Sequence, residues 1–274
     1  MLGAFVFELE AIKDGSIPIS HGRLLHAALL KLINGSSEEL SAYMHSDTEK
    51  CFSIGLLRTL KKPVRGSFDY SKGDKARWRI CSLDDRLTNI ILSIPLKTIM
   101  KIGRVDFMVN NVVHAPEEDS EAGITDINYL VKGCSAIPLP HSVTINFLTP
   151  TTFRAYDKDY PFPNPDLVFT SLAKRFNAFS NVVSFDVKLI KEMIKYIIPD
   201  KWEGKSVRYN ITAERGINCF VGCFSYDLSL LPPEYRRIIV LLCEFAVFSG
   251  VGRLTAQGLG TVKISYQKEN SRNG

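Results

Sequence analysis

The segment FSGVGRLTAQGLGTVKIS, residues 248–265, carries four glycines in two G-x-G pairs with Arg253 between them. The four are Gly250, Gly252, Gly258 and Gly260. Glycine is used densely where the backbone needs a positive φ angle or where another group approaches it closely. Two phosphate-binding motifs are excluded, because Thr255 occupies the third glycine position of a dinucleotide fingerprint and no Gly-Lys-Ser/Thr follows.

The flanks of the glycine pairs predict a loop between a helix and a strand. PPEYRRIIVLLCEFAVFSG, residues 232–250, begins with prolines suited to a first helical turn and ends at a glycine suited to a C-cap. GTVKISY, which follows, alternates like a strand. The dipole at a helix C-terminus disfavours anions. An anion at this loop is therefore expected to be held by backbone N–H groups and Arg253; a flexible turn is the alternative.

The composition is that of an ordinary folded protein, since 45% of the 274 residues are hydrophobic and 23% are charged. The longest apolar run, 238–247, is interrupted by Glu244 and is too short to span a bilayer. The N-terminal segment has acidic residues early and no basic stretch, so no signal peptide is expected. These features predict a cytoplasmic protein without a membrane partner.

The cysteines and acidic residues predict neither a metal nor a cofactor. The six cysteines are scattered through hydrophobic runs, which is typical of reduced core cysteines. Cys219 and Cys223 form the only close pair, and neither a second pair nor a nearby histidine completes a zinc site. The acidic run APEEDSEAG, residues 115–123, is expected to be a solvated loop.

A basic segment at residues 61–79 carries seven Lys and Arg residues against two Asp, in a chain with net charge +5 and pI near 8.8. Strand alternation places Lys75, Arg77 and Arg79 on one face and apolar residues, including Trp78, on the other. A basic strand face beside aromatic side chains is typical of binding to a phosphate backbone. A solvated hairpin is the alternative, and the sequence does not choose between them.

Hydrophobic periodicity predicts the same order of elements in each half of the chain. The first half is expected to contain strands at 3–10, 51–58, 75–81 and 104–113 and helices at 22–33, 38–45 and 84–94. The second is expected to contain strands at 143–148, 207–213, 217–227 and 260–266 and helices within 166–179, 184–197 and 232–248. Each half is a β-α-β-β-α-β unit, the ferredoxin-like arrangement, and the fold class is α+β. A Pro-containing linker at 133–141 separates domains 1–136 and 137–274.

Three of the five histidines lie in residues 21–45. An apolar stripe at helical spacing runs along the first helix: Leu25, Ala28, Leu29 and Leu32. Arg23 and His26 lie three positions apart beside this stripe, and we interpret His26 as a structural residue. No Ser/His/Asp, Cys/His or paired-carboxylate arrangement stands out.

Three stretches resemble the RAMP superfamily and its CRISPR repeat-processing endoribonucleases. SGVGRLTAQGLGTVKI is similar to the glycine-rich signature of the superfamily. GRLLHAALLKLI with LSAYMH, and the central VTINFLTPTTFR, resemble the nuclease branch. The resemblance implies two tandem ferredoxin-like domains with a central cleft. It also implies metal-independent cleavage of precursor CRISPR RNA within each repeat, leaving a 2′,3′-cyclic phosphate and a 5′-hydroxyl.

The resemblance implies a catalytic role for His45, which matches the family's histidine at the end of the short second helix. Leu30 stands where some members have a tyrosine, and Lys50 fits the family's lysine if one residue is skipped. Members with a GR-x-LH start use arginines, to which Arg23 and, in LAKRFNAF, Arg175 correspond. Cleavage by the neighbouring 2′-hydroxyl needs proton transfer and positive charge on the phosphorane. His45 is assigned the first role, as base or acid, and Arg23 with Lys50 or Arg175 the second.

The expected partner is one CRISPR repeat RNA, which is cut once and whose product is either released or retained. RNA contacts are expected at Gly250, Gly252, Arg253, Gly258, Gly260, Lys174, Lys75, Arg77 and Arg79. A monomer and a homodimer both fit the sequence, as does association with effector-complex subunits. The alternatives are a catalytically silent RNA-binding subunit of a CRISPR effector complex and an unrelated nucleotide-binding enzyme.

Overall fold

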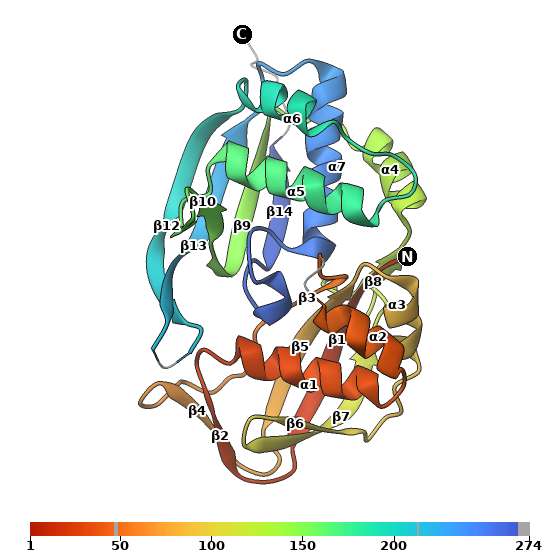
Figure 1. Cartoon of the computed structure of the whole chain (residues 1–274), viewed down its shortest axis with the longest axis vertical. Coiled ribbons are helices and arrows are strands. Elements are labelled where there is room, and N and C mark those ends of the chain that lie inside the picture. Colours follow the sequence, from red (N-terminus) through yellow and green to blue (C-terminus); the bar gives the residue numbers. More distant parts are fainter. Residues whose placement is uncertain (47–48, 213, 268–274) are drawn as a thin grey trace. The chain divides into compact units, whose positions relative to one another are not determined.

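The computed structural model describes residues 1–46, 49–212 and 214–267, and the chain divides into two compact units (Figure 1). Unit 1 consists of Met1–Thr125 and two short segments from later in the chain, Asn210–Ala213 and Leu254–Leu259. Unit 2 consists of the remaining segments: Asp126–Tyr209, Glu214–Arg253 and Gly260–Gly274. The first unit therefore ends before the boundary expected at residue 136.

Unit 1 is built on an antiparallel sheet with strand order β3-β5-β1-β7-β6. Its strands are β1 (Leu2–Ala11), β3 (Phe52–Ile54), β5 (Lys75–Ser82), β6 (Ile99–Ile102) and β7 (Val105–Val113), and β8 (Gly123–Thr125) also pairs with β1. Its helices are α1 (Gly22–Asn34), α2 (Glu38–His45) and α3 (Asp85–Leu92). The order β1-α1-β3-β5-α3-β7 is the predicted ferredoxin-like unit. A small separate sheet pairs β2 (Gly15–Pro18) with β4 (Ser67–Tyr70).

The two faces of β1 and β5 carry opposite kinds of side chain. Register places Phe7 opposite Trp78, and both are fully buried. On the other face, Glu8 lies opposite Arg77. The apolar face expected for residues 75–80 is confirmed, since Ala76, Trp78 and Ile80 are all buried, but Arg79 on the opposite face is buried as well.

Two helices of unit 1, α2 and α3, begin at residues whose side chains cap them. The Ser37 hydroxyl accepts a hydrogen bond from the Leu40 N–H at 3.2 Å, which starts α2. The Asp84 carboxylate accepts one from the Arg86 N–H at 2.7 Å, which starts α3. The apolar face of α1 is buried at Leu25, Ala28, Leu29 and Ile33. In Figure 1, α1 and α2 lie together in front of the sheet of unit 1.

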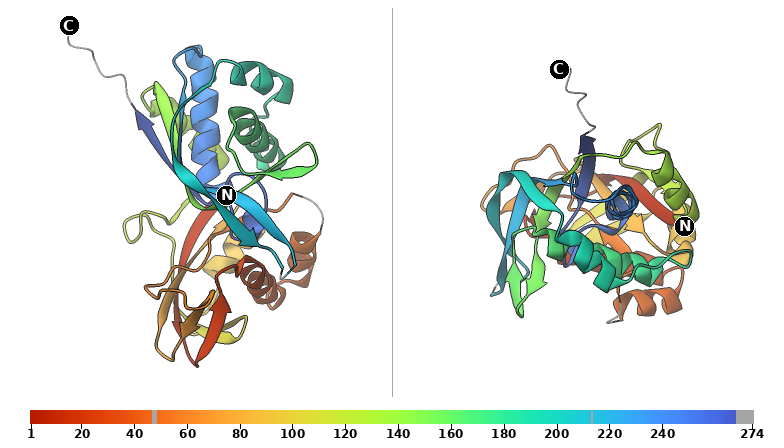
Figure 2. Two further views of the ribbon diagram at one scale, coloured as in Figure 1. Left: turned by 90° about the vertical axis from the view of Figure 1, so that its left-hand side faces the viewer. Right: turned by 90° about the horizontal axis from the view of Figure 1, so that it is seen from above.

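Unit 2 has a four-stranded sheet in the order β12-β13-β9-β14, the strand order of the ferredoxin-like fold. Its strands are β9 (Ser142–Thr151), β12 (Ile198–Asn210), β13 (Gly216–Asp227) and β14 (Val262–Gln267), and β10 (Phe153–Ala155) pairs with β11 (Lys158–Tyr160). Its helices are α4 (Ile127–Ala136), α5 (Pro165–Phe179), α6 (Val187–Ile194) and α7 (Pro233–Ser249). The core joins Phe169 of α5 to Tyr226 of β13, and Phe176 of α5 to Phe245 of α7. Figure 2 shows these elements from two further directions.

Some predicted elements differ from the observed ones. The expected linker at 133–141 begins inside α4, because Asp126 caps that helix through the Tyr129 N–H and Pro138 comes only after it ends. Strand β12 starts well before the strand expected at 207–213, and β3 is shorter than the strand expected at 51–58. No helix in the described part of the chain has the length and apolar character needed to cross a membrane.

Candidate active site

His26, on the second turn of α1, is held by a backbone group from far along the chain. Its Nδ1 lies 2.8 Å from the carbonyl oxygen of Ala256. Its half-buried ring stacks on Phe52, with the centroids 5.6 Å apart and the planes at 28°. A carbonyl only accepts, so Nδ1 carries the proton and donates it. In the neutral ring, the lone pair therefore lies on Nε2.

The pKa of His26 is lowered chiefly by burial, and the hydrogen bond to Ala256 opposes this only in part. Electrostatic interaction with Lys50, His45 and Arg23 lowers the pKa further. His26 is therefore neutral near pH 7. Three residues predicted from the sequence thus act electrostatically on a fourth, His26, which the sequence had suggested was structural.

Arg23, His45 and Lys50 come from three places in unit 1. Arg23 is exposed on the first turn of α1, one turn before His26. His45 is the exposed last residue of α2. Lys50 is half-buried between α2 and β3, and its ammonium donates to the carbonyl oxygen of Ser46. The three residues thus come from α1, from the end of α2 and from the segment that joins α2 to β3.

His21 illustrates what a structural histidine looks like in the same region. It is 1% exposed, its Nδ1 donates to the Pro18 carbonyl at 2.9 Å, and its Nε2 accepts from the Leu57 N–H at 2.9 Å. Burial lowers its pKa. Because both ring nitrogens are engaged by backbone groups, His21 has no nitrogen left for proton transfer.

The glycine-rich segment contains Ala256, whose carbonyl oxygen accepts the hydrogen bond from His26. Residues Leu254–Leu259, which include the short helix η1 (Thr255–Gln257), belong to unit 1 and pack on α1 and β3. The two glycine pairs lie on either side of η1, and all four glycines have positive φ angles between 69° and 87°. The predicted C-cap at Gly250 is confirmed. The segment therefore acts as a support for the imidazole.

The atoms that lie closest to Gly252 and Gly258 belong to other residues of the chain. A Cβ on Gly252 would lie 2.4 Å from the Thr152 carbonyl oxygen, and one on Gly258 would lie 2.5 Å from Leu56 Cδ2. Many N–H groups of the loop donate to the chain's own carbonyls, among them those of Gly250, Val251, Arg253, Leu259 and Gly260. The Arg253 guanidinium is ion-paired with Asp159. Contact of this loop with RNA stays a prediction.

The acidic run 115–123 is only in part the solvated loop that the sequence suggested, since Glu117 and Glu118 are exposed but Asp119 and Glu121 are not. Asp119, whose side chain is 10% exposed, is ion-paired with Arg77, and the Glu121 carbonyl accepts from Arg79 Nε at 2.9 Å. The Glu121 carboxylate also lies 2.5 Å from Arg58. This correction follows from charge complementarity between the loop and the basic face of β5. Within the basic triad, only Lys75 is exposed without an ion pair among the described residues.

Two predicted residues lie in unit 2. Lys174 is exposed and Arg175 is half-buried, both on α5. Their roles in binding or catalysis stay predictions. Among the residues that the structure describes, no three His, Cys, Asp or Glu side chains are grouped so that they could hold a metal ion.

Two family models match the chain. Residues 3–123 match the CRISPR Cas6 N-terminal domain, and residues 145–262 match CRISPR-associated endoribonuclease Cas6. A curated protein of the latter name from Mycobacterium tuberculosis is 27% identical over 129 residues. That match covers 47% of this chain and 40% of the length of the relative.

Solved structures share the fold. A Cas6 from Thermus thermophilus has a TM-score of 0.72 at 24% identity, covering 97% of this chain and 98% of that one. A Cas6 product complex has a TM-score of 0.74 at 24% identity, covering 96% and 99%. A Cas6-related protein from Pyrococcus furiosus has a TM-score of 0.66 at 16% identity, covering 97% and 99%. These likenesses confirm the two ferredoxin-like domains, and with both domain models matched the chain belongs to the CRISPR-associated Cas6 family.

Proposed function

We propose that this chain is an endoribonuclease that cleaves precursor CRISPR RNA within its repeats by attack of the RNA's own 2′-hydroxyl. The observation that carries the proposal is the imidazole of His26, which the Ala256 carbonyl holds through Nδ1 and on which Arg23, His45 and Lys50 act electrostatically. Cleavage of this kind needs one group to remove a proton, one to supply a proton, and cations beside the phosphate. Unit 1 offers each of these.

His26 is suited to be the base. Its ring is neutral, and the hydrogen bond from Nδ1 to Ala256 leaves the Nε2 lone pair to accept the 2′-hydroxyl proton. The O2′–P bond then forms as the P–O5′ bond breaks. We assign His45 to protonate the leaving O5′. The products are a 2′,3′-cyclic phosphate and a 5′-hydroxyl.

The cations have a binding role and a catalytic role. Arg23 has an exposed guanidinium one helical turn from His26. A guanidinium can donate two parallel hydrogen bonds to two oxygens of one phosphate. Lys50, with Arg175 as the alternative, adds charge that stabilises the phosphorane. Because the attacking oxygen belongs to the RNA, no water has to be activated, so the reaction needs no Lewis acid. We place this reaction in the cytoplasm.

The test is incubation of the purified full chain with repeat RNA from its own CRISPR locus, beside a shuffled RNA of equal length. One cut in each repeat and none in the shuffled RNA is the expected result. Repeat RNA that is bound but remains uncut would favour the silent effector subunit instead. RNA that is neither bound nor cut would contradict both functions.

A further inference from the structure

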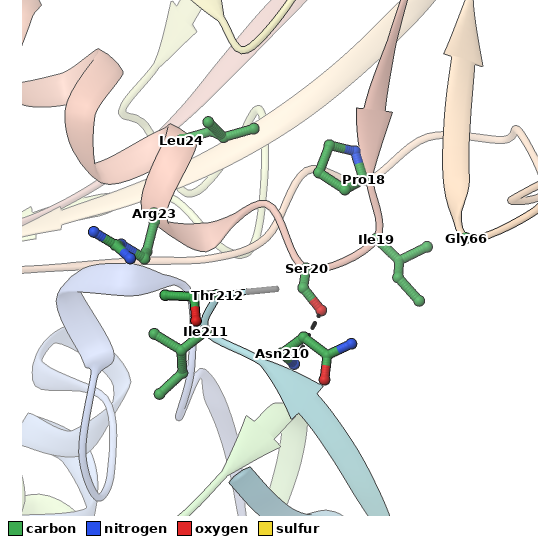
Figure 3. Close-up of a pocket in the computed structure, with 9 residues that line it drawn as sticks. All are labelled: Pro18, Ile19, Ser20, Arg23, Leu24, Gly66, Asn210, Ile211 and Thr212. Atoms are coloured by element: carbon green, nitrogen blue, oxygen red, sulfur yellow. Dashed lines mark hydrogen bonds between the residues drawn. The ribbon is translucent and has the colours of Figure 1, made fainter. Parts of the chain in front are cut away.

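A cavity of about 590 Å³ lies in unit 1 beside the exposed Arg23. Figure 3 shows it between the end of β2, the first turn of α1 and residues 210–212. Its apolar wall consists of Pro18, Ile19, Leu24 and Ile211. Ser20, Arg23 and Asn210 are polar residues that line it. A mostly apolar hollow with a few polar groups is typical of a site for a flat organic molecule.

Asn210 is the residue in this cavity best suited to recognise a ligand. Its backbone N–H donates to the Ser20 hydroxyl at 3.3 Å, which ties residues 210–212 to the start of α1. Within the described part of the chain, its carboxamide makes no hydrogen bond. It therefore presents both a donor and an acceptor. Figure 3 shows this carboxamide on the Ile19 side of the hydrogen bond and the Arg23 guanidinium on the opposite side.

This arrangement matches the parts of one nucleotide. A guanidinium binds phosphate, apolar side chains cover the face of a base, and a carboxamide pairs with the donors and acceptors on the edge of a base. Proteins that recognise RNA sequence commonly do so on unstacked single-stranded bases. We propose that the cavity receives the base next to the cleaved phosphate and that Asn210 sets which base is accepted. The inference rests on the proposed function, because it is Arg23 of the candidate active site that fixes the phosphate.

The first test is the rate of cleavage of a panel of repeat RNAs with each of the four bases on either side of the cut. The wild-type chain should prefer one base at one of these positions by at least about tenfold. Asn210→Ala should remove most of that preference, and Asn210→Asp, which replaces the amide donor with an acceptor, should change the preferred base. Asn218→Asp, at an exposed position on β13, is the control and should leave the preference unchanged.

The second test does not depend on cleavage. Repeat RNA with 2-aminopurine on one side of the cut, and a single deoxynucleotide there to block the reaction, is titrated with protein. Because the cavity wall is aliphatic, a base that leaves the stack for it should fluoresce more. The gain should be lost in Asn210→Ala when this variant is saturated with RNA.

The two tests separate this inference from the function on which it rests. Cleavage with the same base preference in all three proteins would overturn the base site while leaving the endoribonuclease intact. Absence of cleavage by the wild-type chain would overturn the proposed function. The fluorescence titration would then decide the base site alone, and an equal signal with the wild-type chain and Asn210→Ala would overturn it.

Discussion

His21 and His26, near the start of α1, differ in the hydrogen bonding of their Nε2 atoms. In His21 both nitrogens are bonded to backbone groups, and the ring is buried. In His26 the described residues provide a hydrogen-bond partner, the Ala256 carbonyl, for Nδ1 alone, while Lys50, His45 and Arg23 act electrostatically on the ring. A neutral imidazole with a fixed tautomer beside cations is suited to accept a proton from a group bound to phosphate.

His26→Gln tests the role of the base. The glutamine amide can still donate to the Ala256 carbonyl, but it cannot accept a proton at neutral pH. Single-turnover cleavage should therefore fall by about 10²- to 10⁴-fold, whereas RNA affinity and melting temperature change little. His45→Ala should have an effect of similar size, for loss of the acid. The exposed His114→Gln serves as the control; equal losses of binding and cleavage in His26→Gln would instead make His26 a structural residue.

The lowered pKa values of His21 and His26 predict a stability that declines in mild acid. The unfolded chain takes up these protons below about pH 6.5, whereas the folded chain does so only at lower pH. The unfolded state is therefore favoured as the pH falls through that window. Urea unfolding at about pH 7.5 and about pH 5.5 should give a smaller free energy of unfolding in acid. His21→Gln should show a smaller decline, and an unchanged decline would remove His21 as its cause.

At the scale of elements, the glycine-rich segment is a support that the fold requires. Gly258 has a φ angle of 87° and faces Leu56, so Gly258→Val adds both backbone strain and a collision. We expect a loss of about 2–4 kcal/mol in the free energy of unfolding. Gly73→Val is the control, because Gly73 has a φ angle of 90° but nothing within 4 Å of the added Cβ. Equal losses in the two variants would show that contact with Leu56 has no part in the effect.

The acidic loop 115–123 and β5 are joined by an ion pair. Arg77 is engaged by Asp119, whereas Lys75 is exposed. Lys75→Gln should therefore reduce the slope of RNA affinity against salt by roughly 0.7–0.9. Arg77→Gln should lower stability and leave the slope unchanged. If Arg77→Gln reduced the slope of RNA affinity against salt as much as Lys75→Gln does, Arg77 would also contact RNA. RNA binding would then have to break the ion pair between Arg77 and Asp119.

At the scale of the whole molecule, local patterns were sufficient to predict both ferredoxin-like units but not the segments inserted between their elements. Periodicity located α1, α5 and α7, because each has a continuous apolar stripe and end signals. It could not show that Leu254–Leu259 and Asn210–Ala213 belong to unit 1, because that depends on contacts between residues distant in sequence.

The candidate site, too, could be predicted from the sequence only in part. His45, Arg23 and Lys50 were visible in motifs near one another in the sequence. The spacing of Arg23 and His26 in GRLLH was visible too, but the partner that fixes His26 is Ala256, 230 positions further along. The ion pairs of β5 were hidden for the same reason, since Asp119 lies 42 positions from Arg77. Sequence reasoning therefore named candidate residues, but it could not predict the contacts that hold them in place.

The central claim is that the RNA's own 2′-hydroxyl is the attacking group. Its most direct test is cleavage, in excess EDTA, of a repeat RNA that carries one deoxynucleotide on the 5′ side of the cut, beside the all-ribose RNA. The all-ribose RNA should be cut, with a 2′,3′-cyclic phosphate on its 5′ fragment, while the deoxy-substituted RNA should bind equally well and stay intact. Cleavage of the deoxy-substituted RNA, or activity that disappears with EDTA and returns with magnesium, would contradict the account.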